Sequence, residues 1–87
     1  MSLQLRIVGP KGLIGEQTQL DEVTVQRREA RFDPGSQVAV RPRHAPLLMQ
    51  TCAGELRWRR GSTEGSIDLG RGVLEVLDDH VTVVITD

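Results

Sequence analysis

The sequence predicts a single all-β domain, a small antiparallel β-sandwich of about 8–10 short strands that spans residues 1–87. Three observations lead to this prediction. Apolar and polar residues alternate with a period of two, β-branched residues are concentrated in the alternating segments, and turn-forming residues separate them. A chain of 87 residues forms one domain, and its composition, 38% hydrophobic and 26% charged, is typical of a folded protein.

The alternating segments can be followed in order along the chain. Leu3, Leu5 and Ile7 alternate with polar residues, which places the apolar side chains on one face of a strand. Leu56 and Trp58 alternate with arginines in the same way. The signal recurs, with many β-branched residues, in residues 23–25, 38–40, 67–69, 73–77 and 81–86. Seven or more short strands are therefore expected.

Turn-forming residues lie between these segments, at 9–12, 33–36, 60–62 and 78–80. Residues 17–31 also fit a helix, because several apolar positions fall on one helical face. The β-branched run Val23-Thr24-Val25 opposes a helix, since such side chains lose rotamer freedom there. A strand is therefore preferred in this region.

The charges are distributed unevenly. The formal net charge is −1, yet residues 1–60 carry +4 and residues 61–87 carry −5. Ten of the eleven basic residues are arginines, which make directional contacts with carboxylates and phosphates. The arginine-rich segment 27–43 is either a surface for an acidic partner or a solvated face. No apolar run approaches the roughly 18 residues that cross a bilayer, so we expect a soluble, cytoplasmic protein.

Groups that carry chemistry are few. The spacing of His44, His80 and the single Cys52 requires no metal site, and Asp78-Asp79-His80 is interpreted as a hairpin turn. The serines lack a nucleophile elbow, and the glycine turn at residues 9–12 lacks the ending of a phosphate loop. The sequence therefore predicts no catalytic residue, no metal and no cofactor.

Four ordered landmarks carry a resemblance to a known family. His44-Ala45-Pro46-Leu47-Leu48 is followed by Gly54-Glu55-Leu56-Arg57, then by Gly-Val-Leu-Glu-Val at 72–76 and Val-Thr-Val at 81–83. This order resembles the N-terminal β-sandwich domain of the epsilon subunit of F-type ATP synthases. The match covers most of residues 3–86 but is poor between 26 and 37, and Arg43 and Arg71 stand where the family has glycines.

The resemblance implies a noncatalytic rotor subunit of the central stalk. Such a subunit links the gamma shaft to the c-ring, couples proton translocation to ATP synthesis, and lies peripherally on the cytoplasmic face of the energy-transducing membrane. The implied contacts with gamma are His44, Ala45, Pro46, Leu47, Leu48 and Met49. The implied contacts with the c-ring are Arg28, Arg31, Asp33, Ser36 and Gln37. Residues 1–87 include no counterpart of the family's C-terminal helical hairpin, so inhibition of ATP hydrolysis and ATP binding are not implied.

The physical basis for the gamma contact is the segment between two prolines. Pro42 and Pro46 restrict the backbone around them and hold the intervening residues in a stiff, non-helical conformation. Leu47 and Leu48 then point to opposite faces of an extended chain. Two interpretations stay open: one leucine enters the core while the other is left for a partner, or both belong to the core.

A small β-barrel that binds single-stranded nucleic acid is the alternative function, because such barrels carry arginines. They also stack bases on aromatic rings. The sequence contains only Phe32 and Trp58 as aromatic residues and its net charge is slightly negative. The stacking platform is therefore missing, and we expect no nucleic-acid partner.

Overall fold

The computed structural model describes residues 1–26 and 37–86, which form nine β-strands. Alternation of burial along the strands follows the alternation in the sequence; in β1, for example, every second side chain is buried from Leu3 to Ile7. The strands are β1 (Leu3–Gly9), β2 (Gly12–Leu20), β3 (Glu22–Gln26), β4 (Gln37–Val40), β5 (Leu47–Thr51), β6 (Gly54–Arg60), β7 (Thr63–Leu69), β8 (Gly72–Leu77) and β9 (His80–Ile85).

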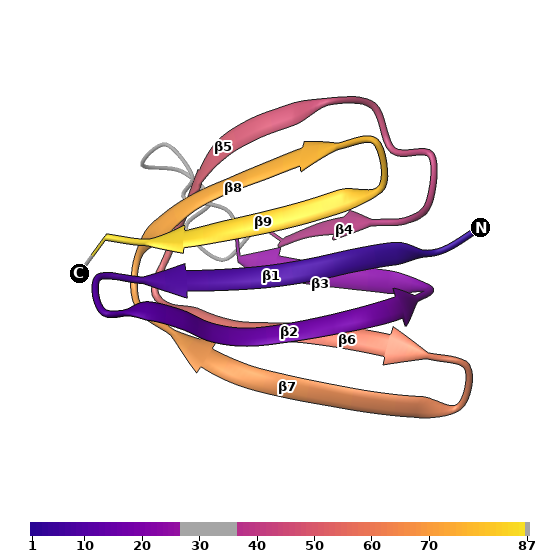
Figure 1. The fold of residues 1–87 in the computed structure, drawn as a ribbon, viewed down its shortest axis with the longest axis horizontal. Coiled ribbons are helices and arrows are strands. Elements are labelled where there is room, and N and C mark those ends of the chain that lie inside the picture. Colours follow the sequence, from indigo (N-terminus) through magenta and orange to yellow (C-terminus); the bar gives the residue numbers. More distant parts are fainter. Residues whose placement is uncertain (27–36, 87) are drawn as a thin grey trace.

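The strands form two sheets that pack face to face, which confirms the predicted sandwich (Figure 1). The first sheet, here called sheet A, has five strands in the order β2-β1-β9-β8-β5, and sheet B has four in the order β4-β3-β6-β7. All neighbouring strands are antiparallel except β1 and β9, which run parallel with Leu5 opposite Val81. The sandwich is thus mostly antiparallel, with one parallel pair where the first and last strands meet.

Residues 17–26 settle the choice between helix and strand for the described part of that region. They belong to the end of β2 and to β3, with Val23 and Val25 buried and Thr24 on the outer face. The rest of the candidate helix, residues 27–31, lies outside the described residues. No membrane-spanning helix, judged by length and apolar character, occurs in residues 1–26 and 37–86.

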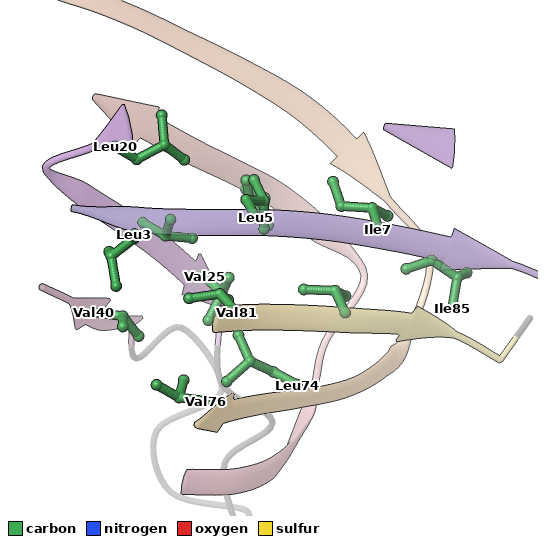
Figure 2. Packing of buried hydrophobic residues seen from close by; sticks show 13 residues of the cluster. Leu3, Leu5, Ile7, Leu20, Val25, Val40, Leu74, Val76, Val81 and Ile85 are labelled. Carbon is green, nitrogen blue, oxygen red and sulfur yellow. The ribbon is translucent and has the colours of Figure 1, made fainter. Parts of the chain in front are cut away.

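The core lies between the sheets and consists of aliphatic side chains from both of them (Figure 2). Sheet A contributes alternate residues of β1, β8 and β9 and the last residue of β2, and sheet B contributes residues of β3, β4 and β6. The buried set is Leu3, Leu5, Ile7, Leu20, Val23, Val25, Val40, Leu56, Leu74, Val76, Val81, Val83 and Ile85.

Trp58 packs against the core near the edge of the sandwich formed by β2 and β7, which are the edge strands of sheets A and B. Its indole lies over Gly65, the residue opposite it on β7, and a side-chain carbon at that glycine would overlap the ring. The Arg60 guanidinium lies 5.0 Å from the ring centroid and donates from Nη2 to the Thr18 carbonyl at 2.9 Å. Arg60 therefore joins sheet B to β2 of sheet A while covering the tryptophan.

Candidate interaction surface

A tight turn begins the segment predicted to contact a partner. The backbone N–H of His44 donates to the carbonyl of Arg41 at 3.1 Å, with Pro42 second in the turn and Arg43 third. Arg43 has φ of +68°, in the left-handed region. This is the pattern of a type II turn, which favours proline at the second position and glycine at the third. The turn redirects the chain from β4 in sheet B toward β5 in sheet A.

Asp79 holds this turn in place from the β8–β9 hairpin. Asp78 and Asp79 both have positive φ, 48° and 62°, as the two-residue turn between Leu77 and His80 requires. The Asp79 carboxylate accepts the backbone N–H of Arg43 at 2.6 Å, and its carbonyl accepts the N–H of Gln4 at 2.9 Å. One residue thus connects β1, the β8–β9 turn and the segment that precedes β5. The predicted hairpin turn at 78–80 is confirmed, but its contact with Arg43 was not predicted.

A second connection fixes the start of the same turn. The Arg41 guanidinium donates from Nε to the Glu22 carboxylate at 2.7 Å, an ion pair between the turn and β3. Together, Asp79 and Glu22 tie the 41–46 segment to both sheets. The segment is thus anchored at two points, one on each sheet.

The side-chain directions of Leu47 and Leu48 decide between the two interpretations that the sequence left open. Both lie in β5, where Leu47 is opposite Val76 and Leu48 is opposite Glu75 of β8. Leu47 is half-buried and packs against the core, whereas the Leu48 side chain is 71% exposed on the outer face of sheet A. One leucine therefore enters the core while the other faces outward, and the interpretation that both are core residues is wrong.

The six predicted gamma-contact residues do not all share one surface. Ala45, Pro46 and Leu48 are exposed, while Met49, like Leu47, packs against the core. His44 is half-buried, and its Nδ1 lies 2.7 Å from the Ala45 carbonyl oxygen, a hydrogen bond that needs the ring proton on Nδ1. The accessible part of the segment is thus an apolar corner of three residues, Ala45, Pro46 and Leu48.

The residues predicted to contact the c-ring fall mostly outside the described part of the chain: Arg28, Arg31, Asp33 and Ser36. Gln37 is described. It is the exposed first residue of β4 and pairs with Gln26 of β3. The 41–46 segment follows the last residue of β4, so Gln37 and the apolar corner lie at opposite ends of that strand.

The described residues bring no reactive groups together. They contain no cluster of three or more His, Cys, Asp or Glu side chains that would bind a metal. The His80 Nδ1 lies 2.8 Å from the Asp78 carbonyl within its own hairpin. Cys52, interpreted from the sequence as a buried residue, is half-buried, and its N–H donates to the Gln26 carbonyl at 3.1 Å.

Comparison with known proteins agrees with this geometry. The family model described as the β-sandwich domain of the ATP synthase delta/epsilon chain matches residues 2–87. The chain belongs to this family.

Two bacterial relatives of this family member match over nearly its whole length. The ATP synthase epsilon chain of Halalkalibacterium halodurans is 30% identical over 83 residues, which is 95% of this chain and 57% of the relative. The ATP synthase epsilon chain of Syntrophobacter fumaroxidans is 35% identical over 83 residues, or 94% of this chain and 56% of the relative. The chain thus spans little more than half the length of each of these epsilon chains.

A solved structure shares the fold of this delta/epsilon sandwich. A chain in the central stalk and c-ring structure of Tetrahymena thermophila mitochondrial ATP synthase superposes with a TM-score of 0.73 at 14% identity. The likeness covers 100% of this chain and 65% of the other. The described strands form two separate sheets, which differ from the barrel of the alternative interpretation.

Proposed function

We propose that this chain is a noncatalytic component of the central stalk of an F-type ATP synthase. In this role it binds the gamma shaft and the c-ring and couples proton translocation to ATP synthesis. It acts at the cytoplasmic face of the energy-transducing membrane, where protein contacts hold it. Membership of the delta/epsilon sandwich family supports this proposal, as do epsilon-chain relatives that match over most of the chain.

The observation that carries the gamma contact is the position of Leu48. This leucine is 71% exposed at the edge of sheet A, directly after a segment that two sheets hold in one shape. A large aliphatic side chain on a rigid support is typical of an interface anchor, because burying it against a partner removes apolar surface from water. The c-ring contact is proposed for residues 28–37, of which Gln37 is described.

Three aspartate substitutions test the gamma contact. Leu48→Asp is expected to lower the free energy of unfolding by no more than about 1 kcal/mol, because the side chain is exposed but the new carboxylate lies directly opposite Glu75. The same change is expected to weaken binding of purified gamma subunit from the same source by about 30-fold or more, since it places an unpaired charge in an apolar contact.

Two controls separate binding from folding. Leu47→Asp introduces a charge beside the core and is expected to lower stability by several kcal/mol, roughly as for other buried unpaired charges. Ser66→Asp places the same charge on the exposed outer face of sheet B and is expected to change neither property. Calorimetric titration measures binding and urea unfolding measures stability. Equal affinity of Leu48→Asp and Ser66→Asp for gamma would remove Leu48 from the interface.

A further inference from the structure

The outer faces of the two sheets differ in chemical character. Six large hydrophobic side chains are exposed among the described residues, and four of them lie on the outer face of sheet A. They are Leu13 (55% exposed), Leu48 (71%), Leu77 (47%) and Val84 (43%). The outer face of sheet B instead exposes charged and polar side chains on β6 and β7: Glu55, Arg57, Glu64, Ser66 and Asp68. The exposed large aliphatic side chains are therefore on sheet A, and Leu48 and Leu77 lie on its neighbouring strands β5 and β8.

Glu75 lies among these aliphatic side chains. It is exposed on β8 between buried Leu74 and Val76, so its side chain is on the outer face. Leu48 of β5 is directly opposite it on one side and Thr82 of β9 on the other. Its neighbours two positions away on the same face of β8 are Val73 and Leu77.

The other charges on this face are already paired. Arg6 of β1 and Glu16 of β2 are opposite each other, with Nε and Oε2 3.8 Å apart. Glu75 forms no ion pair with any residue in the ranges 1–26 and 37–86. The outer face of β5, β8 and β9 thus presents one carboxylate without an ion-pair partner among the described residues, with Val73, Leu77 and Leu48 on its β8 and β5 sides and the polar Thr82 on its β9 side.

We propose that Glu75 accepts a lysine or arginine of the gamma subunit, with Leu48 and Leu77 covering that ion pair from water. This inference rests on the proposed function and enlarges its gamma surface from the 44–49 segment to the outer face of β5, β8 and β9. Charge complementarity selects the partner's cation, because an isolated carboxylate inside an apolar contact is stable only with a counter-charge.

Other occupants of this face are disfavoured by the same carboxylate. A second copy of the chain, placed face to face, would bring two Glu75 side chains toward each other in an apolar contact. An anionic membrane surface would repel the charge. A protein segment with a cation flanked by apolar residues satisfies both features of the face.

Charge substitutions at Glu75 test the proposal, with Glu64 as the matched control. Glu64 is an exposed glutamate on β7, on the outer face of the opposite sheet. Glu75→Gln is expected to weaken the binding of purified gamma about tenfold, and Glu75→Lys more strongly, because a charge-assisted contact is lost or reversed. Glu64→Gln and Glu64→Lys are expected to bind gamma as the original chain does.

The salt dependence of the affinity for gamma is a second measurement, and a purely apolar contact at Glu75 would not change it. Calorimetric titrations at increasing salt concentration are expected to show a smaller loss of affinity for Glu75→Gln than for the original chain, since one ion pair is missing. If the original chain binds gamma but the Glu75 and Glu64 variants behave alike, this inference is overturned and the proposed function stands. If the original chain does not bind gamma at all, both are overturned.

Discussion

Arg43 adopts a backbone conformation that costs glycine almost nothing and costs other residues about 1 kcal/mol. Its φ of +68° accompanies its place as the third residue of the turn and the hydrogen bond from its N–H to Asp79. The resemblance places a glycine at this position, and the structure gives the physical reason. The neighbouring bonds hold an arginine in a conformation it would rarely adopt alone.

Replacing Arg43 by glycine is expected to relieve this strain. Arg43→Gly should exceed Arg43→Ala in free energy of unfolding by roughly 1 kcal/mol, because alanine loses the same side-chain contacts but keeps the left-handed penalty. Urea unfolding of both variants, followed by the fluorescence of the single Trp58, measures the difference. An alanine variant at least as stable as the glycine variant would show that the turn stores no such strain.

The sequence predicted the opposite directions of Leu47 and Leu48 but not which of them is buried. Side-chain alternation follows from an extended backbone, so the opposition can be read locally. The direction depends on the register of β5 against β8, where Leu47 meets Val76 and Leu48 meets Glu75. That register results from contacts distant in sequence, and the motif alone does not reveal it.

At the scale of elements, β8 and β9 depend on close contact between their backbones. Gly72 is buried opposite Ile85, and a side-chain carbon there would overlap the Val84 carbonyl oxygen. Close approach of another backbone therefore requires glycine at position 72. Nothing flexible lies in the overlap, since the nearest atoms belong to the backbone of the neighbouring strand.

Gly72→Ala is therefore expected to lower the free energy of unfolding by about 2–3 kcal/mol, as overpacking does in other well-packed sites. Gly15→Ala is the matched control, because a carbon added there meets nothing within 4 Å. That change should be neutral or slightly stabilising. Thermal and urea unfolding of the two variants measure the contrast, and a Gly72→Ala chain as stable as Gly15→Ala would contradict the close packing of β8 on β9.

Most of the strands could be predicted from a period of two, because local alternation reflects which face of a sheet is buried. β2 was harder to recognise. Only its last residue, Leu20, is buried, and its pairing with β1 shifts register twice, so its sequence shows no regular alternation. The parallel pairing of β1 with β9 joins the two ends of the domain, and no local pattern specifies such a contact.

At the scale of the whole molecule, the residues proposed to contact gamma and those proposed to contact the c-ring lie in different parts of the sandwich. The 41–46 segment and the β8–β9 turn lie at one end, and the β1–β2 turn and the last residues of β9 lie at the other (Figure 1). The outer face of sheet A is apolar around Glu75, and that of sheet B is polar. We infer that gamma binds sheet A and its adjacent corner, which leaves the far end of β4 free for the c-ring.

The family and its motif segment could be found in the sequence because a few ordered landmarks persist through sequence change. The extent of the candidate surface could not be found in the sequence. Glu75 and Leu48 lie far apart in the sequence and become neighbours only through the β5–β8 register. The support that Asp79 gives to the Arg43 turn likewise depends on a contact across 36 positions of the chain.

The central claim is that this domain binds the gamma subunit through one face of its sandwich. Calorimetric titration of the chain into purified gamma subunit from the same source, at moderate salt, tests it most directly, with single-stranded DNA as the parallel control. The account predicts saturable one-to-one binding to gamma and none to DNA. Absence of binding to gamma, together with salt-sensitive binding to DNA, would contradict it.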